Sequence, residues 1–300
     1  MKELKGAITA LITPMKENGD VDYDAFRRLV NFQLEQGIDG IVPLGTTGET
    51  PTLEDDEEEK LIRIAVDEAK GKVPVIIGAG SNSTKHMVMY TKRAKDMGAD
   101  MAMVVTPYYN KPNDSGLLQH FQAAAGVGIP VLVYNIASRT GRNIPTPLME
   151  KIAAIPGIMA VKEASGDIAQ MTEVLQTIAF PRRGGNRPFS VLSGDDSMTL
   201  PLMALGGDGV ISVIANLVPA RVKALTKACL AGDFEEGRRI HFELLPLMKA
   251  AFVETNPVPI KQAMTWAGLP GGTVRLPLGP LEPKNEAPLK AAMQHIGINI

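Results

Sequence analysis

The sequence predicts a (β/α)8 barrel, also called a TIM barrel, followed by a C-terminal helical extension. Eight short apolar runs alternate with longer amphipathic segments over roughly 230 residues, which is the size and element order of a closed parallel barrel. No Gly-x-Gly-x-x-Gly turn follows the first run, so an open dinucleotide-binding sheet is disfavoured. The chain has 300 residues and 45% hydrophobic content, which is enough for one packed core.

The predicted strands are the apolar runs, and each is followed by a segment with the spacing of an amphipathic helix. The second of these helices opens on six acidic residues, Glu54 to Glu59, which suit the positive end of a helix dipole. We expect strands at residues 7–12, 40–44, 73–78, 101–106, 130–134, 158–162, 189–193 and 209–213. We expect helices at residues 23–36, 54–70, 84–97, 116–125, 147–154, 168–178, 197–205 and 219–231.

The residues after these eight units carry only helical patterns. These patterns are broken at Asn256-Pro257 and by the prolines between Pro277 and Pro283. No linker of low complexity precedes them. We therefore expect a catalytic barrel over residues 1–232 and a helical region over residues 233–300 that packs on the barrel and is not an independent domain.

Charge and cysteine content exclude several classes of protein. Lys and Arg number 31 and Asp and Glu number 33, so the net charge is −2 and no basic field favours a nucleic-acid or membrane partner. The single cysteine, Cys229, excludes an internal disulfide framework. The segment from Met1 to Gly6 lacks the apolar core of a signal peptide, and no apolar stretch is long enough to span a bilayer, so a cytoplasmic protein is expected.

Histidine spacing bears on metal and cofactor use. The four histidines, His86, His120, His241 and His295, show no paired metal-ligand spacing, and at least two of them lie in predicted helices. We therefore expect no metal and no other cofactor, and we prefer covalent catalysis by a lysine to metal-assisted chemistry.

Lys162 is a cation at the end of the apolar run Ile158 to Val161. A buried strand of this kind carries an amine to its carboxyl end, where desolvation favours the neutral, nucleophilic form. The position therefore suggests a Schiff base with a carbonyl substrate. The alternative is a snorkelling lysine paired with Glu163 or Asp167, and this segment alone favours that alternative.

The other strand ends carry partners that suit a Schiff-base lysine, because the chemistry of such barrels lies at the carboxyl ends of the strands. The second strand is followed by Thr46 and Thr47, whose hydroxyls and amides can hold a carboxylate or pass a proton. Tyr109 follows the fourth strand and Tyr134 ends the fifth, and a phenol can donate and accept protons. Arg139 has the planar fork that binds a carboxylate.

Segments rich in glycine and aspartate follow the seventh strand and precede the eighth. Asp195, Asp196 and Asp208 would repel a phosphate, so a phosphate site in this corner is disfavoured. We expect the first two aspartates to cap a helix. We expect the backbone near Ile211 to contact a small substrate.

Four motifs together resemble the pyruvate-dependent class I aldolase superfamily, which includes dihydrodipicolinate synthase and N-acetylneuraminate lyase. These are Gly45 to Glu49, Tyr134-Asn135 with Arg139-Thr140-Gly141, Val161-Lys162-Glu163 and Gly209 to Ser212. The resemblance runs from the first strand into the tail. Four segments resemble the dihydrodipicolinate synthase branch in particular: Thr106 to Tyr109, Ser138 to Gly141, Ser193 to Asp196 and Glu254 to Pro257. This resemblance implies a lyase that condenses pyruvate with L-aspartate 4-semialdehyde on the route to diaminopimelate and lysine.

The resemblance also implies catalytic roles. Lys162 would form an imine with the ketone of pyruvate, and the iminium would act as the electron sink. Tyr134 would move protons through Thr46 to Tyr109. In this family the second tyrosine of the Tyr108-Tyr109 pair crosses from a neighbouring subunit. We therefore expect a homotetramer, built as a dimer of dimers, in which assembly is needed for catalysis.

Substrate-binding and regulatory roles follow from the same resemblance. Pyruvate would be held by Thr47 and the backbone at Ile211, with Gly194 in the same site, and Arg139 would bind the carboxylate of the aldehyde. Asn82, His86 and Tyr108 are the residues of a possible allosteric site. Lysine-inhibited members usually carry an acid where this chain has His86, so we expect weak or absent feedback by lysine, although Asn82 and Tyr108 match the inhibited members. Two further departures, Ala137 for a usual proline and Ile214 for a common threonine, remove no reacting group.

Two alternatives stay open at this point. A sister aldolase that acts on N-acetylneuraminate or a 2-keto-3-deoxy sugar acid would use the same lysine and tyrosine, but it would have less use for Arg139. A non-catalytic ligand-binding barrel would keep the fold, but it would not need Lys162, Tyr134, Thr46 and Tyr109 together.

Overall fold

The structure is a computed structural model that describes residues 3–300. Met1 and Lys2, which begin the segment without a signal-peptide pattern, lie outside the described residues. The chain forms two compact units, one of residues up to Gly6 with Ile76–Ile211 and one of Ala7–Val75 with Ser212–Ile300. Eight strands alternate with helices along the described chain, and the strands pair in parallel within each unit. This is the predicted (β/α)8 arrangement.

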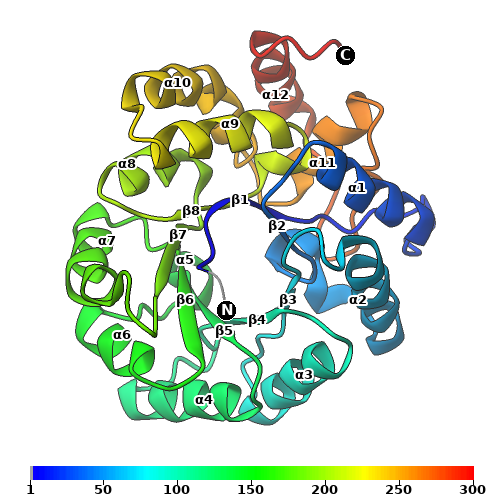
Figure 1. The fold of residues 1–300 in the computed structure, drawn as a ribbon. Helices are drawn as coiled ribbons and strands as arrows, with labels where there is room; N and C mark the ends of the chain where they lie inside the picture. Colours follow the sequence, from blue (N-terminus) through cyan, green and yellow to red (C-terminus); the bar gives the residue numbers. More distant parts are fainter. Residues whose placement is uncertain (1–2) are drawn as a thin grey trace. The chain divides into compact units, whose positions relative to one another are not determined.

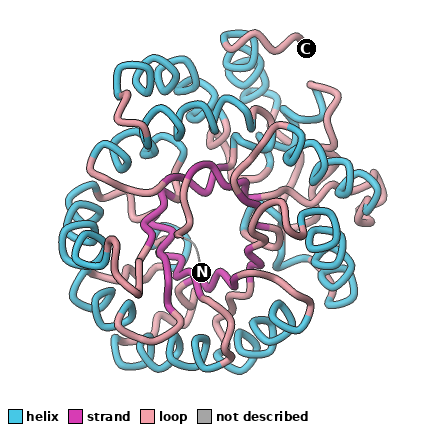
Figure 2. The backbone as a smooth tube through the Cα atoms, in the orientation of Figure 1, coloured by secondary structure: helices cyan, strands magenta, loops and turns pink. Residues whose placement is uncertain are grey.

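The first unit carries a parallel sheet in which the strands follow one another in sequence order from β3 to β8. Helices lie on the outer side of these strands (Figure 1), and Figure 2 shows each strand joined by a loop to the helix that follows it. The strands are β3 (Ile76–Gly78), β4 (Met101–Val105), β5 (Val131–Asn135), β6 (Ile158–Glu163), β7 (Ser190–Ser193) and β8 (Gly209–Ser212). The helices are α3 (Thr84–Asp96), α4 (Asp114–Gly126), α5 (Ala137–Thr140), α6 (Thr146–Ala153), α7 (Ile168–Val174) and α8 (Thr199–Ala204).

An apolar core fills the space between these strands and their helices. Val133 on β5 and Val161 on β6 are fully buried, as are Phe121 on α4 and Met171 on α7. Strands that are covered on both faces read as continuous apolar runs instead of alternating ones, which is why the strand positions could be predicted. Polar side chains set the helix starts, as where Asn113 accepts a hydrogen bond from the N–H of Gly116 at the start of α4.

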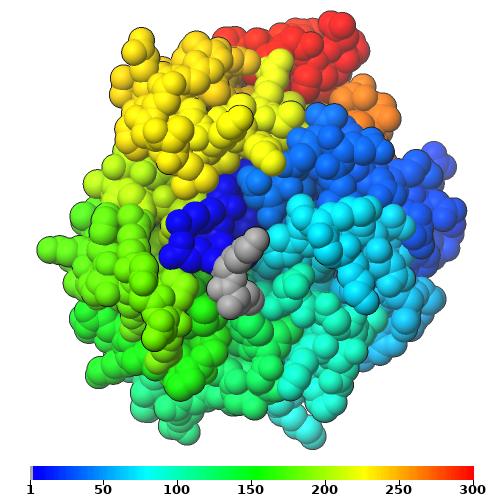
Figure 3. Space-filling view, in the orientation of Figure 1, coloured from blue at the N-terminus to red at the C-terminus, as the bar shows by residue number. Residues whose placement is uncertain are grey.

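The second unit contains the parallel pair β1 (Gly6–Ala10) and β2 (Gly40–Val42) with helices from both ends of the chain. Glu54 and Glu57 form a capping box at the start of the second helix, which confirms the predicted acidic first turn. Helix α10 (Phe234–Ala250) contacts both α9 (Pro219–Leu230) and α12 (Pro283–His295), and Figure 3 shows the yellow and red parts of the chain side by side. The helices are α1 (Tyr23–Glu35), α2 (Asp55–Ala69), α9 (Pro219–Leu230), α10 (Phe234–Ala250), α11 (Val258–Trp266) and α12 (Pro283–His295).

The tail after residue 232 is helical, as expected, and its separation from a barrel of residues 1–232 stays a prediction. Two strands are shorter than predicted by two residues or more. The second ends at Val42, because Pro43 has no N–H to donate and Leu44 takes a left-handed φ of 57°. The third begins at Ile76, after Pro74. No helix within residues 3–300 has the length and apolar content that a bilayer span requires.

Candidate active site

Lys162 and Tyr134 lie opposite each other on the neighbouring strands β6 and β5. Residues that are opposite in a sheet point to the same face, and the Nζ atom of Lys162 is 4.2 Å from the centre of the phenol ring. The two residues are only 5% and 4% exposed. The structure therefore brings together the amine and the phenol that the sequence predicted for Schiff-base chemistry.

Burial lowers the pKa of Lys162 from its ordinary 10.5 to about 8. The negative charge of Asp196 opposes this shift, and the positive charge of Arg139 adds to it. At pH 7 a pKa of about 8 leaves roughly a tenth of the side chain as neutral amine, against roughly 0.03% for a pKa of 10.5. The neutral amine is the form that attacks a carbonyl.

The snorkelling alternative for Lys162 is wrong, because the side chain is buried. The two acids that this alternative invoked are also engaged elsewhere. The carboxylate of Glu163 accepts hydrogen bonds from the Asn135 side chain and from the N–H of Ser165. The carboxylate of Asp167 caps α7 by accepting from the N–H of Ala169.

Gly194 leaves room for the stem of Lys162. A Cβ atom at position 194 would lie 3.1 Å from the Cγ and Cε atoms of Lys162 and 2.7 Å from the Cβ of Ala164. The N–H of Gly194 donates to the carbonyl of Glu163 at 2.8 Å, which holds the turn after β7 against the end of β6. Only glycine allows this approach without displacing a neighbour. The sequence predicted a substrate-binding role for Gly194, and the structure places this residue against the side chain of Lys162.

The two neighbouring aspartates that follow Gly194 differ in their surroundings. Asp195 is a cap as predicted, since its carboxylate accepts a hydrogen bond from the N–H of Ser197 at 2.8 Å. For Asp196 the capping role stays a prediction; the residue is 1% exposed, and its charge raises the pKa of Lys162. In a tight 3-10 turn, adjacent side chains point in different directions. The sequence pattern Asp-Asp does not reveal which of the two side chains is buried.

Arg139 lies on α5, a single turn directly after β5 that the sequence did not predict. Its side chain is exposed, and its charge acts on Lys162. A surface depression starts two residues further on and is lined by Gly141, Arg142 and residues Lys111 to Ser115. Arg139 is therefore exposed on the turn after β5 and close enough for its charge to act on Lys162.

The tyrosine pair after β4 is turned towards solvent. Tyr109 is 89% exposed with a φ of 70°, and Tyr108 is 38% exposed. The side chain of Asn110 donates a hydrogen bond to the carbonyl of Asn82 at 2.8 Å, so this loop and the loop before α3 are joined. His86 lies exposed in the first turn of α3, with its ring centre 6.3 Å from that of Tyr90.

The predicted threonines lie in the second unit, on a 3-10 turn after β2 that spans Thr46–Gly48. Thr46 is half-buried, while Thr47 is buried and its hydroxyl accepts a hydrogen bond from the Asn256 side chain at 2.9 Å. Next along the chain, Glu49 forms a buried ion pair with Lys261 of α11, with 2.6 Å between oxygen and nitrogen. Sequence reasoning missed this pair, because its members are 212 positions apart.

Two other features lie apart from the reactive side chains. All four histidines lie on helices, and no group of three or more His, Cys, Asp or Glu within residues 3–300 is placed to hold a metal ion.

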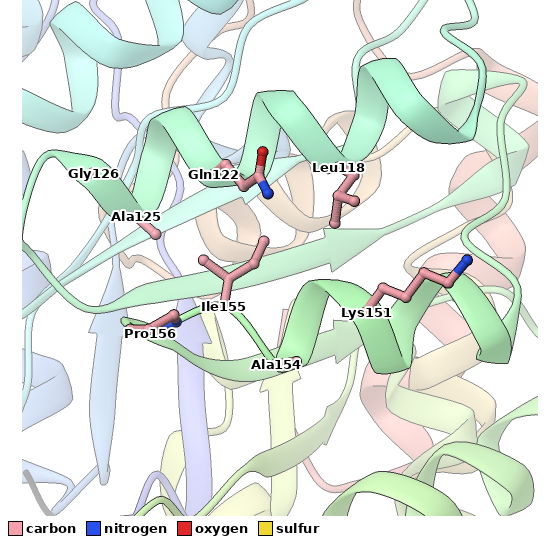
Figure 4. A pocket seen from close by; sticks show the side chains of 8 residues that line it. All are labelled: Leu118, Gln122, Ala125, Gly126, Lys151, Ala154, Ile155 and Pro156. Carbon is pink, nitrogen blue, oxygen red and sulfur yellow. The ribbon is translucent and has the colours of Figure 1, made fainter.

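Figure 4 shows a depression between the end of α4 and the turn before β6, lined by residues such as Gln122, Lys151 and Ile155. It lies at the amino ends of β5 and β6, whereas Lys162 and Tyr134 lie near their carboxyl ends.

Comparison with known proteins shows the family of this chain. The model of the dihydrodipicolinate synthetase family matches residues 3–296. This chain belongs to that family. A 4-hydroxy-tetrahydrodipicolinate synthase of Protochlamydia amoebophila is 48% identical and covers 92% of this chain and 91% of its own. The family resemblance seen in the motifs is thus confirmed.

Solved structures confirm the fold class of this dihydrodipicolinate synthetase family member as a (β/α)8 barrel. The dihydrodipicolinate synthase of Aquifex aeolicus is 46% identical, with a TM-score of 0.92 over 98% of both chains. A chloride-inhibited dihydrodipicolinate synthase of Acinetobacter baumannii, in complex with pyruvate, is 37% identical, with a TM-score of 0.93 over 99% of this chain and 100% of its own.

Proposed function

We propose that this chain catalyses the reaction of the 4-hydroxy-tetrahydrodipicolinate synthases. It condenses pyruvate with L-aspartate 4-semialdehyde through a Schiff base, on the route to diaminopimelate and lysine. The observation that carries this proposal is the buried amine of Lys162, with a pKa of about 8, placed 4.2 Å from the ring centre of Tyr134. Membership of the dihydrodipicolinate synthetase family supports the choice of substrates. So does the pyruvate bound to the Acinetobacter relative.

The reaction begins when the neutral amine of Lys162 attacks the ketone carbon of pyruvate. Tyr134 gives a proton to the departing hydroxyl, water leaves, and a protonated imine remains on the lysine. This iminium withdraws electrons, so the pyruvate methyl group loses a proton and becomes a nucleophile. The resulting enamine carbon then attacks the aldehyde carbon of the second substrate.

The remaining residues receive roles from the same scheme. Thr47 and the backbone at Ile211 hold the pyruvate carboxylate, and Arg139 binds the carboxylate of the aldehyde through its planar fork. Protons pass between Tyr134 and bulk water through Thr46 and a Tyr109 that comes from a neighbouring subunit. The exposure of Tyr109, 89%, supports an outward role in a cytoplasmic homotetramer built as a dimer of dimers.

Borohydride trapping tests the lysine directly. Pyruvate and borohydride together should add a reduced pyruvyl group to the peptide that contains Lys162, as read by mass spectrometry, and Lys162→Ala should abolish the adduct. The mechanism is contradicted if the wild-type protein forms no adduct, or if the adduct is undiminished in the variant. Turnover of aspartate semialdehyde against N-acetylneuraminate and 2-keto-3-deoxy sugar acids separates the synthase from its sister aldolases.

We also propose that lysine inhibits this enzyme weakly or not at all. His86 stands where inhibited members carry an acid, and it cannot supply a carboxylate to pair with the amine of the inhibitor. A lysine titration of wild-type activity should be flat, and His86→Glu should introduce inhibition. Strong inhibition of the wild type at low lysine concentration contradicts the proposal.

A further inference from the structure

A buried polar network lies behind the reactive pair. Asn135 and Glu163 directly follow Tyr134 and Lys162 and are opposite each other in the same strand register. Successive residues of a strand point to opposite faces, so these two side chains point away from the face that carries the amine and the phenol. Both are 0% exposed.

The side chain of Asn135 holds both ends of the loop that carries Arg139. Its side-chain amide donates to both carboxylate oxygens of Glu163 at 3.2 Å and to the side-chain oxygen of Asn143 at 2.8 Å. Its side-chain oxygen accepts from the N–H of Ile144 at 3.0 Å. The segment of residues 136–143 is therefore tied at both ends to one buried amide, and Arg139 lies in the middle of this segment.

Glu163 is the acceptor on which this network converges. Besides Asn135, it accepts from the N–H of Ser165 at 2.7 Å and from the side-chain amide of Gln170 at 3.3 Å. Gln170 in turn exchanges hydrogen bonds with Asn143 at 2.7 and 3.3 Å and donates to the carbonyl of Ile144 at 3.3 Å. Each of these partners of Glu163 donates, so a carboxylate satisfies the site and a group with its own N–H would not.

We propose that Glu163 is a positioning residue for the second substrate. It holds the Arg139 loop in a fixed place relative to the strand that carries Lys162. The proposal rests on the reaction assigned above, in which the enamine on Lys162 must meet an aldehyde whose carboxylate is bound by Arg139. Misplacing that carboxylate by about 1 Å is enough to cost roughly a hundredfold in rate. Arg139 acts on imine formation with pyruvate only through its charge, the smallest of the three influences on the pKa of Lys162, so this step is largely spared.

The test is Glu163→Gln, which keeps the shape of the side chain but replaces one acceptor oxygen with a donor that faces the amide groups of Asn135 and Gln170. We expect the KM for aspartate semialdehyde, at saturating pyruvate, to rise by about tenfold or more. The KM for pyruvate and the borohydride adduct should stay within about twofold of wild type. The matched control is Glu173→Gln on α7, an exposed carboxylate that accepts from the Thr146 hydroxyl at 2.8 Å and should leave the kinetics unchanged.

A second variant covers the case in which Glu163→Gln fails to fold. Asn143→Ala removes the partly buried far end of the network and should raise the same KM. The double variant should be little worse than either single one, because both act through the same loop. A parallel loss of adduct and of both KM values, or wild-type kinetics in both variants, overturns the proposal. A wild type that neither traps pyruvate nor turns over aspartate semialdehyde contradicts the proposed function instead.

Discussion

At the scale of single residues, Lys162 shows how burial alone prepares a nucleophile. Desolvation, the largest influence, lowers its pKa, and the Asp196 charge only partly reverses that shift. If the charge of Asp196 had outweighed desolvation, the pKa of Lys162 would not have fallen, and the side chain would be an ammonium at neutral pH. The outcome, a pKa of about 8, leaves a usable fraction of free base and still allows ready reprotonation.

The rate of imine formation should therefore depend on pH. The pKa of Lys162 in the folded protein is about 8, so the neutral fraction grows about tenfold per pH unit below that value and levels off above it. Initial rates of borohydride trapping at limiting pyruvate should follow this curve. Asp196→Asn removes a charge that raises the pKa, so its curve should move to lower pH. A wild-type rate that keeps rising to a pH of about 10 contradicts this account.

Gly194 allows a second test at this scale. Gly194→Ala places a methyl group 2.7 Å from the Cβ of Ala164 and 3.1 Å from the stem of Lys162, so the lysine must move. We expect kcat to fall by about ten- to a hundredfold and stability to fall by about 1–3 kcal/mol. Steady-state kinetics and urea unfolding measure the two effects. Gly126→Ala is the control, because its Cβ meets nothing within 4 Å, and normal activity in Gly194→Ala would refute the steric role.

At the scale of secondary-structure elements, the pairing of β5 with β6 places the two proposed reacting side chains on one face of the sheet and the two side chains that support the Arg139 loop on the other. The register sets Tyr134 against Lys162 and, one residue later, Asn135 against Glu163. Because side chains alternate between faces, the pair to which we assign the reaction and the pair to which we assign support of the Arg139 loop point to opposite faces. A slip of one residue in either strand would exchange the two faces and destroy both functions.

The turn after β2 depends on a different kind of support. Glu49 has a left-handed φ of 55°, and its carboxylate also accepts the N–H of Arg275 at 3.0 Å. Lys261 donates to the carbonyl of Thr13 at 2.9 Å and pairs with Glu49, and both charged side chains are 1% exposed. This ion pair anchors the turn of Thr46 and Thr47 to helix α11.

Breaking this ion pair should be costly. Lys261→Met leaves the Glu49 carboxylate buried without its cation, and we expect a loss of about 3–5 kcal/mol in the free energy of unfolding, measured with urea. Adding Glu49→Gln should restore part of the loss. The control is Lys60→Met, which breaks an exposed pair with Asp56 and should leave the free energy of unfolding close to that of the wild type. Equal effects of the two lysine variants would show that burial of the pair is not what matters.

At the scale of the whole molecule, the exposure of Tyr109 supports the proposal that the enzyme works as an assembly of chains. An aromatic side chain that is 89% exposed, on a residue with a φ of 70°, contributes little to the core of its own chain. A catalytic tyrosine supplied to a neighbouring subunit explains both features.

Complementation between inactive variants tests this assembly. Lys162→Ala and Tyr109→Phe should each have little activity alone. If Tyr109 acts in the partner's site, a mixed dimer has one intact site, so an equal mixture after subunit exchange should regain about a quarter of wild-type activity. A mixture that stays as inactive as its components shows that Tyr109 acts within its own chain or not at all. Affinity capture through a tag on one variant, with detection of the other variant in the captured fraction, confirms that mixed assemblies form.

Prediction from sequence was accurate wherever a local pattern carried the information. Apolar runs located all eight strands, and the acidic run from Glu54 located the start of a helix. The same patterns failed where backbone geometry intervened, as at Pro43 and Leu44, which end β2 early. They also failed for α5, a single turn of four residues that is too short to show a helical period.

By itself, the sequence determined the kind of protein: a barrel with a lysine, a tyrosine and an arginine at its strand ends, in the dihydrodipicolinate synthetase family. Tertiary structure alone decided how these groups are prepared for reaction. Three features depend on residues that are far apart along the chain. These are the burial that lowers the pKa of Lys162, the space left by Gly194 and the Glu49–Lys261 ion pair. Desolvation and steric fit depend on what surrounds an atom in space, and neighbours in sequence do not reveal it.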